Sequence, residues 1–307
     1  MLLKQLTSSM TSKEFSVDIV KNTKVQLSSQ QLVDYADNGF LLIKDVFDLE
    51  EIGILSEAVD LSIAEQENGE KNLEGGLVCE EDQSTIRTLN GLHFEYEIFK
   101  QLCCHPRLLY PAQQLLLDNE LYVYQFKVNL KKAFVGDIWE WHQDYIYWLK
   151  GDGMPEPKAV SVAIFLDDVT EYNAPLMFIP GSHKLGVIDV LPQFDIQADK
   201  PSWLHFVASK LQYPAPREVV TAEAHKRGLV APKGSKGSIL FFHGNIFHGS
   251  SSNLSPFDRR FIFITYNPVT NVDINFPHPR SRFLSSRDTT PLVMKTDSII
   301  KELYKLC

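Results

Sequence analysis

The chain has few cysteines, and their spacing argues against two common kinds of site. The four are Cys79, Cys103, Cys104 and Cys307, and no two form a Cys-x-x-Cys pair. A structural zinc site usually closes with four nitrogen or sulfur ligands and often uses cysteine, so this spacing disfavours one. We expect the neighbouring Cys103 and Cys104 to fill the core rather than form a redox pair, and we expect a reducing, cytoplasmic compartment.

The chain also lacks an excess of positive charge and a long apolar run. Its 30 Lys and Arg against 39 Asp and Glu give a net charge of −9, whereas a nucleic-acid-binding surface needs clustered positive charge. No apolar run approaches the roughly 18 residues of a membrane span, and polar residues follow Leu2 and Leu3, so we expect no membrane segment and no signal peptide. The expected partner is a small-molecule substrate. We expect the protein to be either a monomer or a homodimer.

The first part of the chain, about 1–120, is predicted to be largely helical. A short helix is expected to end at Gly39, since glycine readily adopts the conformation that closes a helix. Asp48 and Glu51 have the spacing of a capping box, which predicts the start of a longer second helix. Helical character returns between residues 94 and 117.

Short β-like runs bounded by turns dominate from about residue 121. The predicted strands are residues 40–43, 121–130, 160–166, 176–179, 239–242 and 261–266. Alternation in the long run from 121 to 130 predicts two faces. One face would carry Tyr122, Tyr124, Phe126 and Val128, and the other Gln125, Lys127 and Asn129. Several short strands without regular intervening helices indicate an antiparallel barrel or jelly roll rather than a doubly wound sheet.

We expect residues 1–307 to form a single domain that is mainly β with peripheral helices. Its jelly-roll core would span about 121–270. An insertion at about 185–236 contains several prolines and would cover the core as a lid, because stretches of this length within a compact domain often do so. Residues 271–307 would form a C-terminal extension.

The most informative motif is His142-Gln143-Asp144, which lies within an aromatic run from Trp139 to Trp148. Residues two apart in an extended strand point to the same face, so the imidazole and the carboxylate are expected to meet at one point. Taken alone, such a triplet is more often structural than metal-binding. Ionisable groups in an aromatic neighbourhood need a partner or a metal, however, and this context favours the metal.

A third ligand is predicted at His248, with His243 as the fallback. Two histidines and one carboxylate are the set that holds Fe(II) on one face and leaves the other positions open, although a catalytic zinc with three ligands is not excluded. Ser250 and Arg259 add a hydroxyl and a guanidinium, a pair suited to holding a carboxylate. Alone, Arg259 would be interpreted as a surface cation paired with Asp258.

Four motifs carry a resemblance to a known family. They are residues 125–131, 141–155, 173–184 and 242–271. With them, the chain resembles the phytanoyl-CoA dioxygenase superfamily of Fe(II)/2-oxoglutarate oxygenases, and within it the ectoine hydroxylase branch. The resemblance implies a double-stranded β-helix, a cupin-like jelly roll, with Fe(II) inside and with 2-oxoglutarate and O2 as cosubstrates.

The resemblance also implies roles for individual residues. The residues that match the iron ligands are His142, Asp144 and His248. Those expected at the 2-oxoglutarate site are Arg259, Ser250, Asn129 and Lys127. Those expected around the substrate are Gln125, Trp148, Tyr145, Tyr147, Phe261 and Arg280.

The chain departs from ectoine hydroxylases directly after Asp144. Ectoine hydroxylases read Phe-Glu-Thr-Trp-His there, whereas this chain reads Tyr-Ile-Tyr-Trp-Leu at 145–149. Phe261 likewise replaces a polar residue after Arg259. Changes of this size reshape a pocket and argue against ectoine itself as the substrate. The retained Asp144 argues against a halogenase, because that chemistry needs the carboxylate position vacated for chloride.

We therefore expect an oxygenase that oxidises an unactivated C–H bond of a small polar, amino-acid-like metabolite and releases succinate and CO2. Hydroxylation is the default outcome, and desaturation or oxidative ring closure stay open. One alternative is a jelly-roll metal-dependent isomerase or hydrolase that needs no 2-oxoglutarate. The other is a non-catalytic metal-binding relative.

Overall fold

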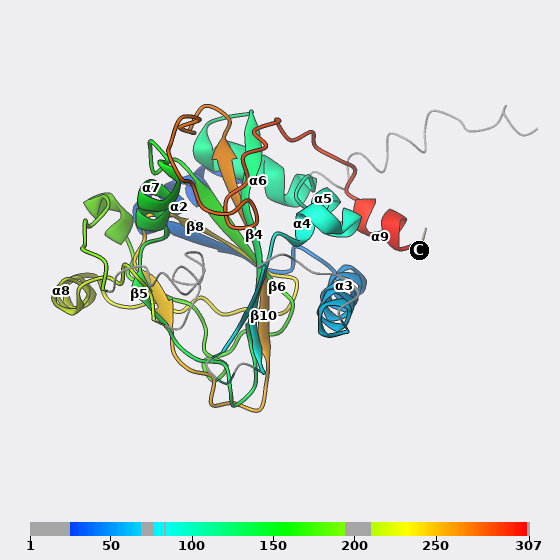
Figure 1. Cartoon of the computed structure of the whole chain (residues 1–307), viewed down its shortest axis with the longest axis horizontal. Coiled ribbons are helices and arrows are strands. Elements are labelled where there is room, and N and C mark those ends of the chain that lie inside the picture. Colours follow the sequence, from blue (N-terminus) through cyan, green and yellow to red (C-terminus); the bar gives the residue numbers. More distant parts are fainter. Residues whose placement is uncertain (1–24, 69–75, 81, 83, 194–209, 306–307) are drawn as a thin grey trace, which may run out of the picture.

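The computed structural model describes residues 25–68, 76–80, 82, 84–193 and 210–305. Within them, a seven-stranded sheet and a three-stranded sheet are built from antiparallel pairs (Figure 1). The large sheet runs, in spatial order, β1 (Phe40–Ile43), β8 (Ile239–His243), β6 (Val160–Phe165), β10 (Arg259–Pro268), β4 (Leu121–Lys131), β3 (Ile86–Asn90) and β2 (Leu77–Cys79). The small sheet runs β5 (Trp139–His142), β9 (His248–Ser250) and β7 (Met177–Phe178).

Local capping signals position the first helices as predicted. Gln31 and Ser28 form a reciprocal capping box at the start of α2, and Gly39 ends that helix with a φ of 81°. Asp48 and Glu51 form the same arrangement at the start of α3. The helices are α2 (Ser29–Asn38), α3 (Leu49–Glu67), α4 (Leu92–Glu95), α5 (Glu97–Leu102), α6 (Pro106–Leu116), α7 (Asp144–Asp152), the 3-10 turn η1 (Ser182–Leu185), α8 (Arg217–Arg227) and α9 (Ile299–Tyr304). In the part of the chain that the structure describes, none of them has the length and apolar character of a membrane span.

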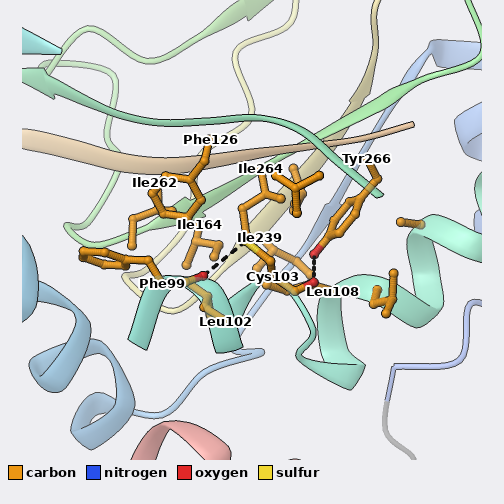
Figure 2. Packing of buried hydrophobic residues seen from close by; sticks show 14 of the residues in the cluster. Phe99, Leu102, Cys103, Leu108, Phe126, Ile164, Ile239, Ile262, Ile264 and Tyr266 are labelled. Atoms are coloured by element: carbon orange, nitrogen blue, oxygen red, sulfur yellow. Dashed lines mark hydrogen bonds between the residues drawn. The ribbon is translucent and has the colours of Figure 1, made fainter. Parts of the chain in front are cut away.

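One face of the large sheet carries the main core. Side chains from α3, α5, α6 and α9 pack there against side chains of β4, β6, β8 and β10, and Figure 1 shows these helices together on one side of the sheet. Figure 2 shows Cys103 among these residues, with its thiol against the carbonyl of Phe99 and its own carbonyl bonded by the hydroxyl of Tyr266. Cys103 is thus a core filler, as predicted.

The opposite face of the large sheet meets the small sheet. Phe178 of β7 stacks on Phe40 with ring centroids 5.1 Å apart and contacts Phe242 of β8 at 5.7 Å. A second apolar cluster therefore joins the two sheets, with Phe165 and Phe263 among its members. The polar residues that follow lie beside this cluster, between the two sheets.

The predicted assignment of side chains to the two faces of β4 is wrong for the first half of the strand. Gln125 pairs with Thr265 of β10, but Val123 pairs with the next residue, Tyr266, so Tyr124 is an extra residue that forms a β-bulge. The bulge shifts the alternation by one residue. Tyr122 and Tyr124 consequently pack with the aromatic residues of α7, away from the core that holds Phe126 and Val128.

Three further predictions concern the helical first part of the chain, the lid at 185–236 and the C-terminal extension. The part assigned to helices also supplies β2 and β3, two short strands at one edge of the large sheet. Of the predicted lid at 185–236, residues 194–209 lie outside the described residues, while α8 and the segment 210–216 are described. The extension crosses β4, where Ser286 N donates to Tyr124 O and Leu292 N donates to Leu121 O.

Candidate metal centre

Two histidines of the small sheet face each other across neighbouring strands. His142 ends β5 and His248 begins β9, and the two are direct partners in the ladder. The Nδ1 atom of His142 lies 2.7 Å from the carbonyl of Glu140, and that of His248 lies 3.1 Å from the carbonyl of Ile246. With a proton on each Nδ1 donated to these carbonyls, both Nε2 lone pairs are presented to a common centre, as metal-binding imidazoles require.

Asp144 completes the centre, but from a helix rather than from the predicted strand. It is the first residue of α7, and Gln143 before it caps the helix in an extended conformation with φ −113° and ψ 134°. This one extended residue suffices to bring His142 and Asp144 to the same side. Oδ1 of Asp144 lies 3.6 Å from Nε2 of His142, and Oδ2 lies 3.9 Å from Nε2 of His248.

Two of the three groups, Asp144 and His248, have pKa values shifted toward the forms that bind a metal ion. The ligand atoms of the three groups all lie within 4.8 Å of one another, and all three residues are buried. Burial acts to raise the pKa of Asp144, but Lys127 and the two histidines outweigh it and hold that pKa below its usual value. Burial, and then His142, lowers the pKa of His248 to about 3. A carboxylate and neutral imidazoles on one side of a centre fit Fe(II) with an open face.

Gln143 supports this geometry, a role that the sequence interpretation missed. Its Nε2 donates to the carbonyls of Gly186 and Asn245 at 2.8 and 2.6 Å, and its Oε1 accepts from the backbone of Ile188 at 2.8 Å. Gln143 therefore ties the turn between the two ligands to the segments on either side. The sequence held a signal for this role, because Gln143 is a polar residue between the two candidate ligands His142 and Asp144 in an otherwise aromatic run.

A small cavity of about 30 Å³ on one side of the centre is rich in groups that bind anions. Arg259 lines it and is only 1% exposed. Its Nε is buried without a hydrogen-bond partner among the described residues, and so is the Oγ of Ser250, which pairs across the ladder with Trp139 but does not line this cavity. Other buried side-chain atoms also lack a partner, so the Nε of Arg259 indicates a ligand because it belongs to a residue that lines a cavity beside the candidate metal ligands. The residues lining this cavity are Lys127, Asn129, Trp139, His142, Leu176, Phe242, His248, Arg259 and Phe263.

A second cavity of about 30 Å³ is lined by His142 and Asp144 and shares Lys127, Trp139 and His142 with the first. It brings together four of the residues predicted to surround the substrate, namely Gln125, Tyr147, Trp148 and Arg280. The others lining it are Thr88, Lys127, Trp139, His142, Asp144, Leu211 and Leu284. Of these, Thr88, Trp139, Leu211 and Leu284 were not predicted, because only the folded chain brings β3, β5 and two distant loops to one point.

Two residues predicted to surround the substrate lie outside both cavities. The hydroxyl of Tyr145 lies within hydrogen-bond distance, 3.1 Å, of the carbonyls of Met154 and Pro155, which follow the end of α7. Phe261 stacks on Phe165 with centroids 4.7 Å apart, and the guanidinium of Arg259 lies 4.4 Å from the Phe261 ring. Phe261 thus supports Arg259 from behind.

Arg280 belongs to a buried network of three side chains. Its Nε donates to Oδ2 of Asp152 at 2.9 Å, and its Nη2 donates to the same oxygen and to the hydroxyl of Tyr124. Tyr124 in turn donates to Asp152. Because Asp152 ends the helix that Asp144 begins, the network connects the C-terminal extension to the element that holds the metal ligand.

The remaining histidines near the centre have structural roles. Nδ1 of His243 accepts from the backbone of Asn245 at 3.0 Å, which supports the end of β8 as predicted. His183 lies in η1 with its Nε2 3.1 Å from the carbonyl of Ala36. Neither belongs to the cluster of ligand atoms found within the described residues.

Comparison with known proteins gives a consistent family. The pattern of the phytanoyl-CoA dioxygenase (PhyH) family matches residues 35–261. An L-proline trans-4-hydroxylase from Streptomyces griseoviridis is 44% identical over 220 residues, which cover 71% of this chain and 80% of that protein. An ectoine dioxygenase from Sphingopyxis alaskensis is 32% identical over 268 residues, covering 85% and 83%.

A solved structure agrees with these relatives. The crystal structure of EctD from S. alaskensis with 2-oxoglutarate and 5-hydroxyectoine matches with a TM-score of 0.73 at 29% identity, covering 88% of this chain and 87% of that one. The family match spans well over half of the sequence and includes all three candidate metal ligands. The chain therefore belongs to the phytanoyl-CoA dioxygenase family, as its four motifs predicted.

Proposed function

We propose that this protein is an Fe(II)/2-oxoglutarate-dependent oxygenase with a double-stranded β-helix core. The observation that carries the proposal is the buried Arg259, whose Nε has no hydrogen-bond partner among the described residues and which lines the same cavity as the candidate metal ligands His142 and His248. A metal-dependent hydrolase or isomerase has no need for a buried guanidinium with an open anion site. A keto acid with a second carboxylate needs both the metal and the guanidinium.

The proposed roles in binding the metal, the cosubstrate and the substrate fall to different residues around the two cavities. His142, Asp144 and His248 would hold the iron. In the first cavity Arg259 would bind the distal carboxylate of 2-oxoglutarate, with Ser250 donating a further hydrogen bond. Asn129 and Lys127, which line the same cavity, would face the keto acid. When bound, iron, 2-oxoglutarate and O2 would supply the oxidation of an unactivated C–H bond with release of succinate and CO2.

The second cavity would hold the substrate, and its lining suits a small amino acid. The amine of Lys127 can donate to a carboxylate, Arg280 lines the cavity while bonded to Asp152, and Tyr147 and Trp148 offer aromatic surface to a compact ring. Tyr147 stands where ectoine hydroxylases have threonine, and its bulk reduces the room. Together with the 44% identity to an L-proline trans-4-hydroxylase, this lining favours L-proline or a similar cyclic amino acid over ectoine.

A turnover assay tests the proposal. Purified protein with Fe(II), ascorbate and 2-oxoglutarate is offered L-proline, ectoine and other free amino acids, and succinate and product mass are measured. We expect L-proline or a close analogue to gain one oxygen atom as succinate forms. A mass loss of two hydrogens would instead indicate desaturation or ring closure by the same machinery.

Neighbouring arginines provide matched variants. Arg259→Ala should raise the KM for 2-oxoglutarate by about 10- to 150-fold, the value of a hydrogen bond to a charged group. Arg260→Ala should leave it unchanged, because that side chain points to the other face and pairs with Asp167 and Asp60. Substrate conversion that survives Arg259→Ala without succinate release would favour an isomerase or hydrolase and overturn the proposal.

A further inference from the structure

We propose that Lys131, buried directly beside Arg259 with no carboxylate bonded to its amine, is a positioning residue for 2-oxoglutarate that links binding of a carboxylate at Arg259 to the uptake of a proton. The inference rests on the proposed function above, and it concerns a residue that lines neither cavity. It would couple the affinity for the cosubstrate to pH.

The β4–β10 ladder places Lys131 beside Arg259. The two residues are direct partners in the antiparallel register, so their side chains leave the sheet on the same face. Both are only 1% exposed. Gly136 makes room for the lysine, because a Cβ at that position would lie 2.8 Å from its Cδ. The sequence therefore accommodates a buried lysine directly next to the anion-binding arginine.

The hydrogen bonds of Lys131 match a neutral amine. Its Nζ donates to the backbone carbonyls of Asp137 and Ser251, the latter at 3.0 Å. A neutral amine has two hydrogens to donate, and two acceptors are present. Neither acceptor is a carboxylate, so no countercharge is bonded to this nitrogen.

Two cations and two acids face Lys131, and the cations have the larger effect on its pKa. Arg259 of β10 and Arg87 of β3 are the cations that face it, and Glu80 and Asp137 are the acids. Glu80 is already bonded to Arg87 at 2.8 Å, and Arg87 also lies over the ring of Trp139 at 3.9 Å. Burial, followed by the repulsion from Arg259 and Arg87, lowers the pKa of Lys131 to about 6.

A carboxylate on Arg259 offsets the part of that repulsion that comes from Arg259. Its negative charge would offset the guanidinium that opposes protonation of Lys131, so the lysine binds a proton more tightly in the complex than in the empty protein. By linkage, protonation strengthens anion binding to the same extent. Affinity for 2-oxoglutarate should accordingly be greatest below pH 6. Above pH 6 it should fall by at most about tenfold per pH unit. The fall should end at the pH at which Lys131 loses its proton in the complex as well.

Calorimetry measures this proton directly. The Fe(II)-loaded protein is titrated anaerobically with 2-oxoglutarate at pH 8 in two buffers of different ionisation enthalpy, and the difference in heat gives the protons taken up. We expect wild type to take up about one more proton per ligand than the variants Lys131→Met and Lys131→Arg. Lys131→Arg stays charged and should bind with little pH dependence, while Lys131→Met should bind more weakly than wild type at pH 6.

Lys132→Met is the matched control, since the neighbouring Lys132 is exposed and pairs with Asp258. It should behave as wild type in uptake and affinity. Equal proton uptake in wild type, Lys131→Met and Lys131→Arg would overturn the inference and leave Lys131 with a structural role only. No 2-oxoglutarate binding by wild type and Lys132→Met would instead contradict the proposed function itself.

Discussion

His142 and His248 are direct partners across the β5–β9 ladder, with their ring centroids 4.2 Å apart. The strand pairing, rather than a long loop, therefore sets the distance between the two imidazoles. Phe178 stacks on the His248 ring at 5.9 Å, and Phe242 contacts it at 5.2 Å, so that the ring has little freedom to turn. A site held in this way is formed before the metal arrives, which favours tight binding.

Removal of one ligand should abolish metal binding without unfolding the chain. His248→Ala leaves two ligands where three are needed, and we expect iron affinity to fall by well over the roughly 100-fold that loss of a supporting contact costs. Metal content after gel filtration with Fe(II) measures the loss. His243→Gln is the control, because His243 lies on the adjoining strand end outside the ligand cluster and should keep the metal.

The predictions from sequence succeeded where the determining interactions are local. The capping box at Asp48 and the glycine end of α2 depend on residues within four positions of one another. The three candidate metal ligands could be selected from the sequence because their residue types are chemically specific, and the structure brings them together. The extended strand assumed for His142 and Asp144 was wrong in its second half, yet the two side chains lie on the same side because only Gln143 had to be extended.

Features that depend on distant pairing were not predictable in this way. The bulge at Tyr124 follows from the register between β4 and β10, which alternation within β4 does not encode. The network of Tyr124, Asp152 and Arg280 joins three segments that meet only in the fold. Lys131 looked like an ordinary strand residue, and its significance comes from its partner across the ladder, Arg259.

Asp152→Asn should destabilise the protein strongly. The substitution removes the carboxylate that neutralises the buried guanidinium of Arg280, and breaking a buried pair on one side costs about 3–5 kcal/mol. Chemical denaturation followed by fluorescence measures the free energy of unfolding. Since Arg280 lines the substrate cavity, the KM for the amino acid should rise as well.

An exposed ion pair provides the comparison for Asp152. Asp189 is 83% exposed and lies 2.6 Å from Lys150. Asp189→Asn should change the free energy of unfolding by less than about 1 kcal/mol, the usual value for a surface pair. Equal effects of the two substitutions would contradict a special role for the buried network.

Tyr147→Thr should relax the substrate preference. The tyrosine lines the substrate cavity, and its hydroxyl accepts a hydrogen bond from the backbone of Tyr213 at 3.0 Å. The smaller side chain enlarges the cavity, so that the kcat/KM ratio of ectoine to L-proline should rise, by about 10-fold or more if one ring-sized contact is exchanged. Tyr172→Thr, at a 71% exposed site, should leave the ratio unchanged. A fall in both activities at a constant ratio would indicate that Tyr147 only supports the fold.

Two buried histidines should make the protein sensitive to mild acid. His93 packs against Phe94 and Phe126, and burial lowers its pKa from 6.5 to about 4. His243 has its pKa lowered to about 4 by burial and then by His183. Between pH 6.5 and about 4 the unfolded chain binds protons at these positions that the folded chain does not, so stability is full above this window and is lost as pH falls through it. Each group contributes on the order of 2–3 kcal/mol.

Denaturation curves at several pH values separate these two groups from general acid effects. In His93→Gln and His243→Gln the acid-dependent loss should be smaller than in wild type, even where the variant is less stable at pH 7. Exposed His225 of α8 is the control, because its side chain is not packed into the interior. His225→Gln should therefore show the same dependence of the free energy of unfolding on pH as wild type. A slope unchanged in all three variants would show that carboxylates alone govern the acid response, and that the two buried imidazoles become protonated without opening their packing.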